Sequence, residues 1–123
     1  MNLVDSSGWL EYLADGPNAD FFAPAIEDRD HLLVSTINLY EVFKRVLSQR
    51  DENDALKAVA LVQQGTVAEV TASVAMAAAT FSHTQKLPMA DSLILITAQE
   101  NNATLWTQDA DFKGLSGVKY IKK

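Results

Sequence analysis

A chain of 123 residues with a net charge of −6 and no cysteine is long enough to bury one hydrophobic core, and the lack of cysteine excludes disulfide bonds and thiolate metal sites. The acidic balance argues against a large basic surface for tight nucleic-acid binding, but it allows a nucleic-acid enzyme whose acids hold metal ions. No stretch is apolar for long enough to cross a membrane, and the first residues lack the pattern of a signal peptide. We therefore expect one domain over residues 1–123 and a cytoplasmic protein.

Short apolar strands alternate with helices along the chain. Asn2–Val4 predicts a strand that ends at Asp5, and either Ser6 or Ser7 can cap the helix that follows, which closes at Gly16-Pro17. The later helices are predicted at Asn18–Arg29, Thr36–Gln49, Asp51–Gln64, Ser73–Lys86 and, with Pro88 in its first turn, up to Asn101-Asn102. The later strands are predicted at Leu32–Val34, Thr66–Val70, Ala103–Thr107 and Val118–Ile121. This alternation predicts an α/β fold with a mostly parallel sheet of about five strands and helices on both faces.

Four acids can reach one edge of this sheet. Right-handed crossovers bring the carboxyl ends of all parallel strands to the same edge, and each acid either follows a predicted strand or lies near the start of a helix: Asp5, Glu41, Asp91 and Asp109. Each also has an ordinary explanation. Asp91 could complement a helix dipole, Asp109 could cap a turn, and Glu41 could pair with Arg45 one turn along its helix. Only their convergence favours a site.

Carboxylates that gather in a water-poor site repel one another, and divalent cations are the usual remedy. Oxygen ligands in this number suit Mg²⁺ or Mn²⁺. Zinc is disfavoured because there is no cysteine and neither His31 nor His83 is placed to join. A carboxylate cluster with one or two such ions is typical of phosphoryl transfer, in which a metal-activated water attacks the phosphate. Since the chain has no Gly-rich phosphate loop, hydrolysis of a phosphodiester is the interpretation that the residues favour.

Other polar residues near the acids are weaker candidates. Three hydroxyl residues could orient the carboxylates, although capping a helix or ending a strand is the commoner role of each: Ser6, Ser35 and Thr107. Five basic residues are candidates for substrate contact, although surface charge is their commoner role: Lys44, Arg45, Arg50, Lys86 and Lys113. We expect Trp9 and Trp106 to lie in the core rather than to stack on bases.

Three segments together resemble a known family: VDSSGW at Val4–Trp9, Ser35–Glu41, and ADSLILITAQENNATLWTQDADF at Ala90–Phe112. They resemble the PIN-domain nucleases, and among these most resemble the VapC-type toxins of bacterial toxin–antitoxin pairs. The match spans the whole chain in order and in length. The last segment is the most specific, because an Asp-led apolar helix followed by a short strand and TxDxDF is an unusual combination.

The resemblance implies a three-layer α/β/α sandwich and an endoribonuclease that depends on Mg²⁺ or Mn²⁺. By position, the family's acidic quartet is Asp5, Glu41, Asp91 and Asp109, and Asp111 matches a further, more variable acid. The resemblance also implies an RNA substrate, a homodimer and a small antitoxin partner that places a basic side chain near the acids. The segment Asp51–Lys86 carries no motif and would help form the groove that selects the substrate.

Two other classes of function stay open. A receiver-like signalling domain would also have an acidic pocket at the edge of a parallel sheet. Such a domain requires a phosphate-accepting Asp after the third strand, where this chain has Val70-Thr71-Ala72. A catalytically inactive PIN-fold binding module would keep the fold for partner contact alone.

Overall fold

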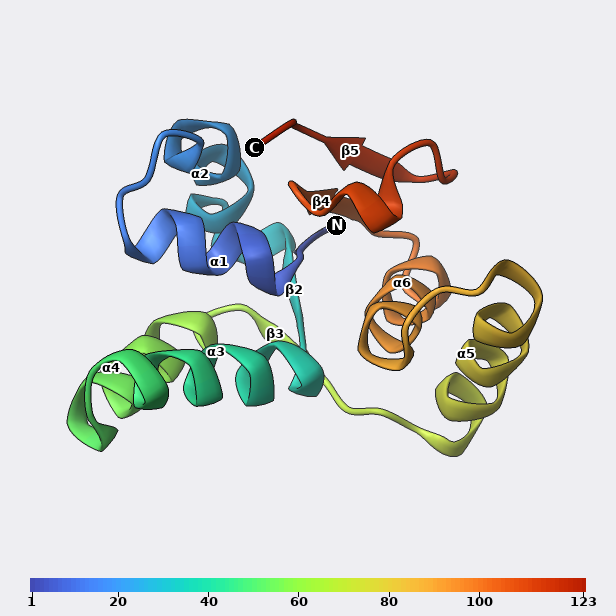
Figure 1. Cartoon of the computed structure of the whole chain (residues 1–123), viewed down its shortest axis with the longest axis horizontal. Coiled ribbons are helices and arrows are strands. Elements are labelled where there is room, and N and C mark those ends of the chain that lie inside the picture. The colour runs from blue at the N-terminus through green and yellow to red at the C-terminus, as the bar shows by residue number, and fades with distance from the viewer.

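Five parallel strands form the centre of the computed structural model, which describes residues 1–123 (Figure 1). The strands are β1 (Asn2–Val4), β2 (Leu32–Ser35), β3 (Thr66–Ala68), β4 (Thr104–Thr107) and β5 (Val118–Tyr120). They lie in the order β3-β2-β1-β4-β5, and every neighbouring pair is parallel. The predicted α/β fold with a parallel sheet of five strands is therefore confirmed.

The helices fall close to their predicted positions. They are α1 (Ser6–Leu13), α2 (Ala19–Glu27), α3 (Thr36–Gln49), α4 (Glu52–Val62), α5 (Ala72–Gln85) and α6 (Met89–Glu100), with short 3₁₀ helices η1 (Arg29–His31) and η2 (Ala110–Phe112). Pro88 precedes α6 with a ψ of 155°, so it caps the helix instead of lying in its first turn. The strand β3 ends at Ala68 rather than Val70, because its partner β2 turns into α3 after Ser35 and offers no further backbone to pair with.

Alternation of side chains along the strands divides the core between the two faces of the sheet. Val4 and Val34 pack with Trp9 and Phe22 under the layer formed by α1 to α4. Their neighbours Leu3 and Leu33 face the other way and pack against α6, with Leu105. In Figure 1 the first four helices, coloured blue to green, lie on one side of the strands, and α5 and α6 lie on the other. The molecule is thus a three-layer α/β/α sandwich.

The helix α6 is apolar almost all round because it is covered on two sides. One side packs on the sheet through Ile94 and Leu95, and the other packs on α5 through Ile96, which contacts Val74 and Ala78. A helix buried in this way needs no polar stripe. No helix in the structure is both long and apolar enough to span a membrane.

The strand order of the sheet distinguishes this fold from that of a receiver-like signalling domain. The chain leaves β1 toward β2 on one side and leaves β4 toward β5 on the other, so the switch point of the sheet lies between β1 and β4. Ligands of open α/β sheets bind at such points, outside the carboxyl ends of the strands. A receiver-like fold has the order 2-1-3-4-5, with its third strand in the centre, whereas β3 here is an edge strand. The receiver-like alternative is therefore excluded.

Candidate metal centre

A cleft of about 470 Å³ opens at the carboxyl edge of the sheet. The cleft is lined by all four acids that were predicted from the sequence to lie at this edge: Asp5, Glu41, Asp91 and Asp109. They come from four different parts of the chain, namely the end of β1, the second turn of α3, the first turn of α6 and the loop after β4. Parallel strands and right-handed connections bring these parts together at the switch point.

Asp5 is the most deeply buried of the four acids, with 3% of its surface exposed. Its Oδ2 accepts hydrogen bonds from the Ser7 hydroxyl at 2.7 Å and from the Thr107 hydroxyl at 3.0 Å. Burial raises the pKa of Asp5, the two hydroxyl donors oppose that rise, and the charge of Asp109 adds to it. Thr107 also accepts a hydrogen bond from the backbone N–H of Asp109 at 2.9 Å, so one hydroxyl positions two acids.

Glu41 is held by a relay of buried polar groups. Its Oε1 accepts a hydrogen bond from the Ser6 hydroxyl at 2.7 Å, and Ser6 in turn accepts one from Nδ2 of Asn38 at 3.0 Å. The alternative role of Glu41, a pair with Arg45, is not observed, because Glu41 turns toward Ser6. Burial raises the pKa of Glu41, and the charges of Asp5 and Asp109 raise it further against the effect of Ser6.

Ser35 does not orient an acid. Its hydroxyl accepts a hydrogen bond from the backbone N–H of Ile37 and caps α3, while its own N–H donates to Asn38 Oδ1. The commoner role of a serine before a helix is thus the observed one. Of the three hydroxyl residues considered, Ser6 and Thr107 bind acids and Ser35 positions Asn38.

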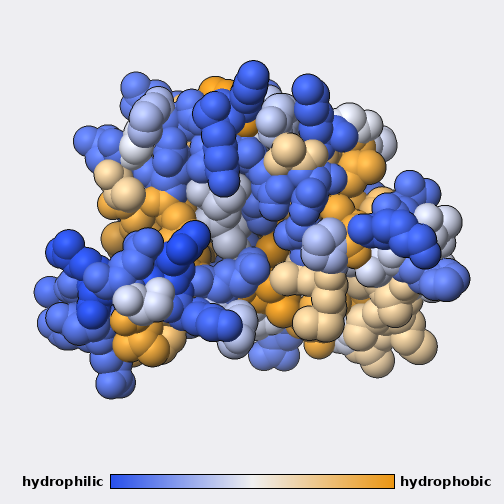
Figure 2. All heavy atoms as spheres, viewed as in Figure 1, coloured by the Kyte–Doolittle hydropathy of each residue, from blue (hydrophilic) through white to orange (hydrophobic).

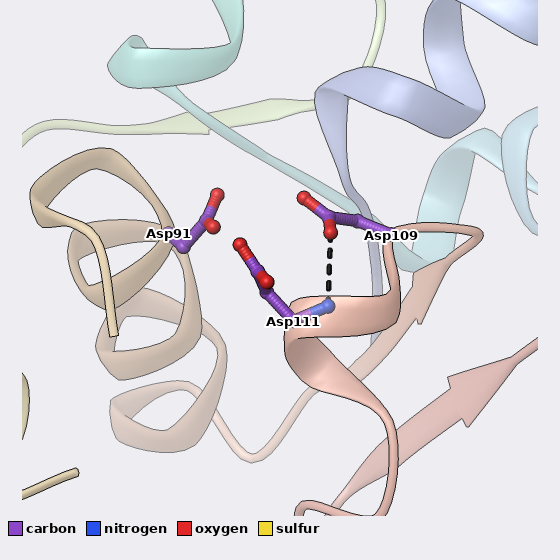
Figure 3. Close-up of side chains that lie close together, drawn as sticks. All are labelled: Asp91, Asp109 and Asp111. Carbon is purple, nitrogen blue, oxygen red and sulfur yellow. Dashed lines mark hydrogen bonds between the residues drawn. The ribbon is translucent and has the colours of Figure 1, made fainter. Parts of the chain in front are cut away.

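Three aspartates form the tightest group in the cleft region. Asp91, Asp109 and Asp111 each place a carboxylate oxygen within 4.8 Å of the other two. Figure 3 shows these side chains pointing toward one another from α6, from the loop after β4 and from η2. Oδ1 of Asp109 also accepts the backbone N–H of Asp111 at 2.9 Å, which closes the turn into η2. Asp5 and Glu41 line the cleft beside this group rather than within it.

The crowding of negative charge is strongest at Asp91. Burial, and after it the charges of Asp109, Asp5, Asp111 and Glu41, together raise the pKa of Asp91 to about 7. A nearby positive charge would favour the ionised form of this carboxyl group. The donor set consists of oxygen atoms only, which fits a hard divalent cation such as Mg²⁺ or Mn²⁺.

Two residues that orient the acids escaped the sequence interpretation. The sequence predicts for Ser7 only the role of a helix cap and for Asn38 no role, yet Ser7 donates a hydrogen bond to Asp5 and Asn38 donates one to Ser6. The signal for Asn38 was present in the sequence, because Asn38 stands three residues after Ser35, in the spacing of a capping box. Its second contact, to Ser6 from α1, depends on the tertiary fold alone.

The five basic candidates for substrate contact lie at different places on the molecule. Lys44 and Arg45 line the acidic cleft, Arg50 lines a neighbouring hollow together with Arg45, and Lys86 and Lys113 line neither. The tryptophans belong to the framework, as expected. Trp9 is 1% exposed, and half-buried Trp106 donates its Nε1–H to Asn2 Oδ1 at 2.9 Å.

Fold and site together define an α/β domain with a carboxylate-lined cleft at the switch point of a parallel sheet. The profile of the PIN domain matches residues 3–118, and the chain therefore belongs to the PIN domain family. Among curated proteins, none matches the sequence at a significant level.

Solved structures share this fold over almost their whole length. A toxin–antitoxin complex from Klebsiella pneumoniae has a chain with 22% identity and a TM-score of 0.79, over 97% of this chain and 96% of that one. VapC20 from Mycobacterium tuberculosis, described as a sarcin–ricin loop cleaving toxin, has 15% identity and a TM-score of 0.77, over 94% and 95%. VapBC2 from Rickettsia felis, bound to a DNA fragment from its promoter, has 16% identity and a TM-score of 0.72, over 98% and 97%. At these identities the likeness establishes the fold.

Proposed function

We propose that this protein is a divalent-metal-dependent endoribonuclease and the toxin of a toxin–antitoxin pair. The observation that carries the proposal is the convergence of four carboxylates in one cleft at the switch point of the sheet. An acid there whose pKa is raised to about 7 supports a site that is completed by positive charge. Membership of the PIN domain family and likeness in fold to VapC toxins support the same conclusion.

Asp5, Glu41, Asp91 and Asp109 would hold the Mg²⁺ or Mn²⁺, with Asp111 close enough to join. Such an ion supplies a Lewis acid that activates water and neutralises charge on a phosphate. The protein contributes a fixed arrangement of carboxylates. Residues that hold the carboxylates in place matter to metal sites almost as much as the ligands themselves. None of the four acids needs to act as a nucleophile.

The partners follow from the same proposal. RNA is the substrate, and a small antitoxin binds the toxin, as in the neighbours described as toxin–antitoxin or VapBC complexes. A basic side chain that the antitoxin places in the cleft would compete with the cation for the same carboxylates. We also propose a homodimer and a cytoplasmic location.

The test is cleavage of a mixed pool of structured RNAs by the purified protein, with Mn²⁺ and with EDTA. The variants are Asp5→Asn and Asp91→Asn, and Asp20→Asn on the exposed surface of α2 is the matched control. We expect cleavage that requires Mn²⁺, is retained in Asp20→Asn and is lost in both cleft variants. Cleavage that persists in the cleft variants would point to a contaminant and contradict the assignment.

Absence of cleavage would leave two possibilities, a nuclease with a narrow RNA target or an inactive binding module. Thermal melting in the presence of Mn²⁺ distinguishes them. A site in the native state raises the melting temperature with metal concentration. A protein that melts at the same temperature with and without Mn²⁺ and cleaves no RNA is a binding module.

A further inference from the structure

A second hollow, of about 680 Å³, adjoins the acidic cleft. It lies between α1, the end of α3 and α4, and it shares three lining residues with the cleft: Ser7, Leu10 and Arg45. Four basic residues line it: Arg45 from α3, Arg50 directly after α3, Lys57 from α4, and Lys123. We call it the basic hollow. Nothing in the assignment of the acidic cleft uses it.

The cations of the basic hollow are less neutralised than a count of its charges suggests. Of its two acidic side chains, Asp54 pairs with Arg50 at 3.1 Å. Glu11 turns toward the connection between α1 and α2, where its Oε2 accepts the backbone N–H of Asn18 at 2.8 Å. Arg45 and Lys57 have no carboxylate within 4.0 Å, since the chain has ion pairs only at His31 and Arg50. These two cations remain available to an anion from outside.

The helix α3 sets the distance between the two sites. Glu41 and Arg45 lie about one turn apart, which corresponds to about 6 Å along the helix axis, and Arg50 follows the last residue of α3. Because Glu41 is engaged by Ser6, the side chain of Arg45 is free to stand at the boundary of cleft and hollow. Figure 2 shows hydrophilic side chains gathered over α3 and α4 at the lower left of the view, whereas hydrophobic residues gather over α5 at the lower right.

We propose that the basic hollow seats the RNA phosphates next to the scissile one, with Arg45 at the boundary and Lys57 on the far wall. This inference rests on the proposed function and adds to it the direction in which the substrate strand leaves the acidic cleft. Unpaired cations beside an acidic centre suit a polyanion better than an apolar peptide, because they attract phosphates at every sequence. An acidic segment of a protein partner is the competing occupant.

The experiment measures binding of a fluorescent single-stranded RNA of mixed sequence, about 12 nucleotides long, over a series of salt concentrations. Ca²⁺ is present to neutralise the acids. The variants are Arg45→Gln, Lys57→Gln and the double variant. Arg29→Gln is the matched control, because Arg29 lies in η1 before the amino end of β2, at the opposite edge of the sheet. Thermal melting of each variant verifies that it is folded.

We expect the slope of log Kd against log salt concentration to fall by about 0.7 for each phosphate that a variant no longer neutralises. It should fall for each single variant, fall further for the double variant and stay unchanged for Arg29→Gln. Unchanged slopes in the double variant, or no salt-dependent RNA binding by the wild-type protein, would overturn the proposal.

Two further measurements distinguish this proposal from a protein-binding role and from failure of the proposed nuclease function. The first is binding of a glutamate-rich peptide by the same variants. Weaker peptide binding with unchanged RNA binding would assign the hollow to a protein partner instead. Cleavage with Mn²⁺ reports on the nuclease itself. A wild-type protein that binds RNA through Arg45 and Lys57 but cleaves none contradicts the nuclease, whereas cleavage by the double variant at wild-type KM contradicts the basic hollow.

Discussion

The hydroxyl of Ser6 donates a hydrogen bond of 2.7 Å to Oε1 of Glu41, although 35 positions separate the two residues in the sequence. Ser6 is the first residue of α1 and Glu41 lies in α3, and the neighbouring strands β1 and β2 end at the same edge of the sheet just before these helices. Asn38 donates to Ser6, so the only hydroxyl proton of Ser6 is directed at Glu41. The contact therefore fixes one wall of the acidic cleft.

The variant Ser6→Ala should impair both the cleft and the fold. It removes the donor to Glu41 and leaves Nδ2 of buried Asn38 without its acceptor, which should lower the free energy of unfolding by about 1–3 kcal/mol. Metal affinity should fall by about 10-fold or more, as for other residues that orient ligands. Urea denaturation and Mn²⁺ titration measure the two effects. The control is Ser73→Ala, which removes an exposed serine–glutamate contact to Glu100 and should change neither quantity.

The metal-free protein should become less stable as the pH rises toward 7. The folded state keeps a proton on Asp91 up to a pKa of about 7, whereas the unfolded chain releases it near pH 4. Between these values the folded state binds more protons, so the free energy of unfolding falls with rising pH. The raised pKa values of Asp5 and Glu41 act in the same direction.

Asp91→Asn tests this dependence. The variant should remove about 1–2 kcal/mol of the fall in stability between about pH 5 and pH 8, a figure reduced for solvent screening because Asp91 is only half-buried. Denaturation in EDTA at both pH values measures it, with Asp20→Asn as the control. A variant whose stability falls as much as that of the wild-type protein would show that Asp91 does not carry the effect.

The exposed residue Asp111 should contribute to metal binding. Its carboxylate lies within 4.8 Å of those of Asp91 and Asp109, while the contact that closes the turn uses its backbone N–H. Asp111→Asn keeps that contact and removes one charge, so the Mn²⁺-dependent rise in melting temperature should require about 10-fold more metal. An unchanged metal titration would place Asp111 outside the site.

Gly8 should resist substitution even though it lies in a helix. A Cβ atom at this position would lie 2.5 Å from the ring of Phe22 and 2.7 Å from Val4. Gly8→Ala gains about 1 kcal/mol of helix propensity, but the overpacked core should cost more, for a net loss of about 1–2 kcal/mol. Urea denaturation measures the change, and a stabilised variant would mean that Phe22 moves aside freely.

Much of the fold could be predicted because local patterns and tertiary structure agree. Alternating short strands and helices predicted the parallel sheet, and the helix Thr36–Gln49 begins where it was predicted to begin because Ser35 caps its amino end. The predicted end of β3 at Val70 was wrong, because the pairing of a strand depends on where its neighbouring strand stops. The ordinary explanation of Glu41, a pair with Arg45, does not hold for a similar reason, since Glu41 accepts a hydrogen bond from Ser6 of α1.

By itself, the sequence determined the class of fold and the four acids at the carboxyl edge, because both depend on patterns within single strands, helices and turns. Only the tertiary structure decided the strand order, the relay from Asn38 through Ser6 to Glu41, the close approach of Asp91, Asp109 and Asp111, and the hollow beside Arg45. Each of these joins residues from different elements. Such contacts depend on how the elements pack across the sheet, and no spacing along the chain encodes them.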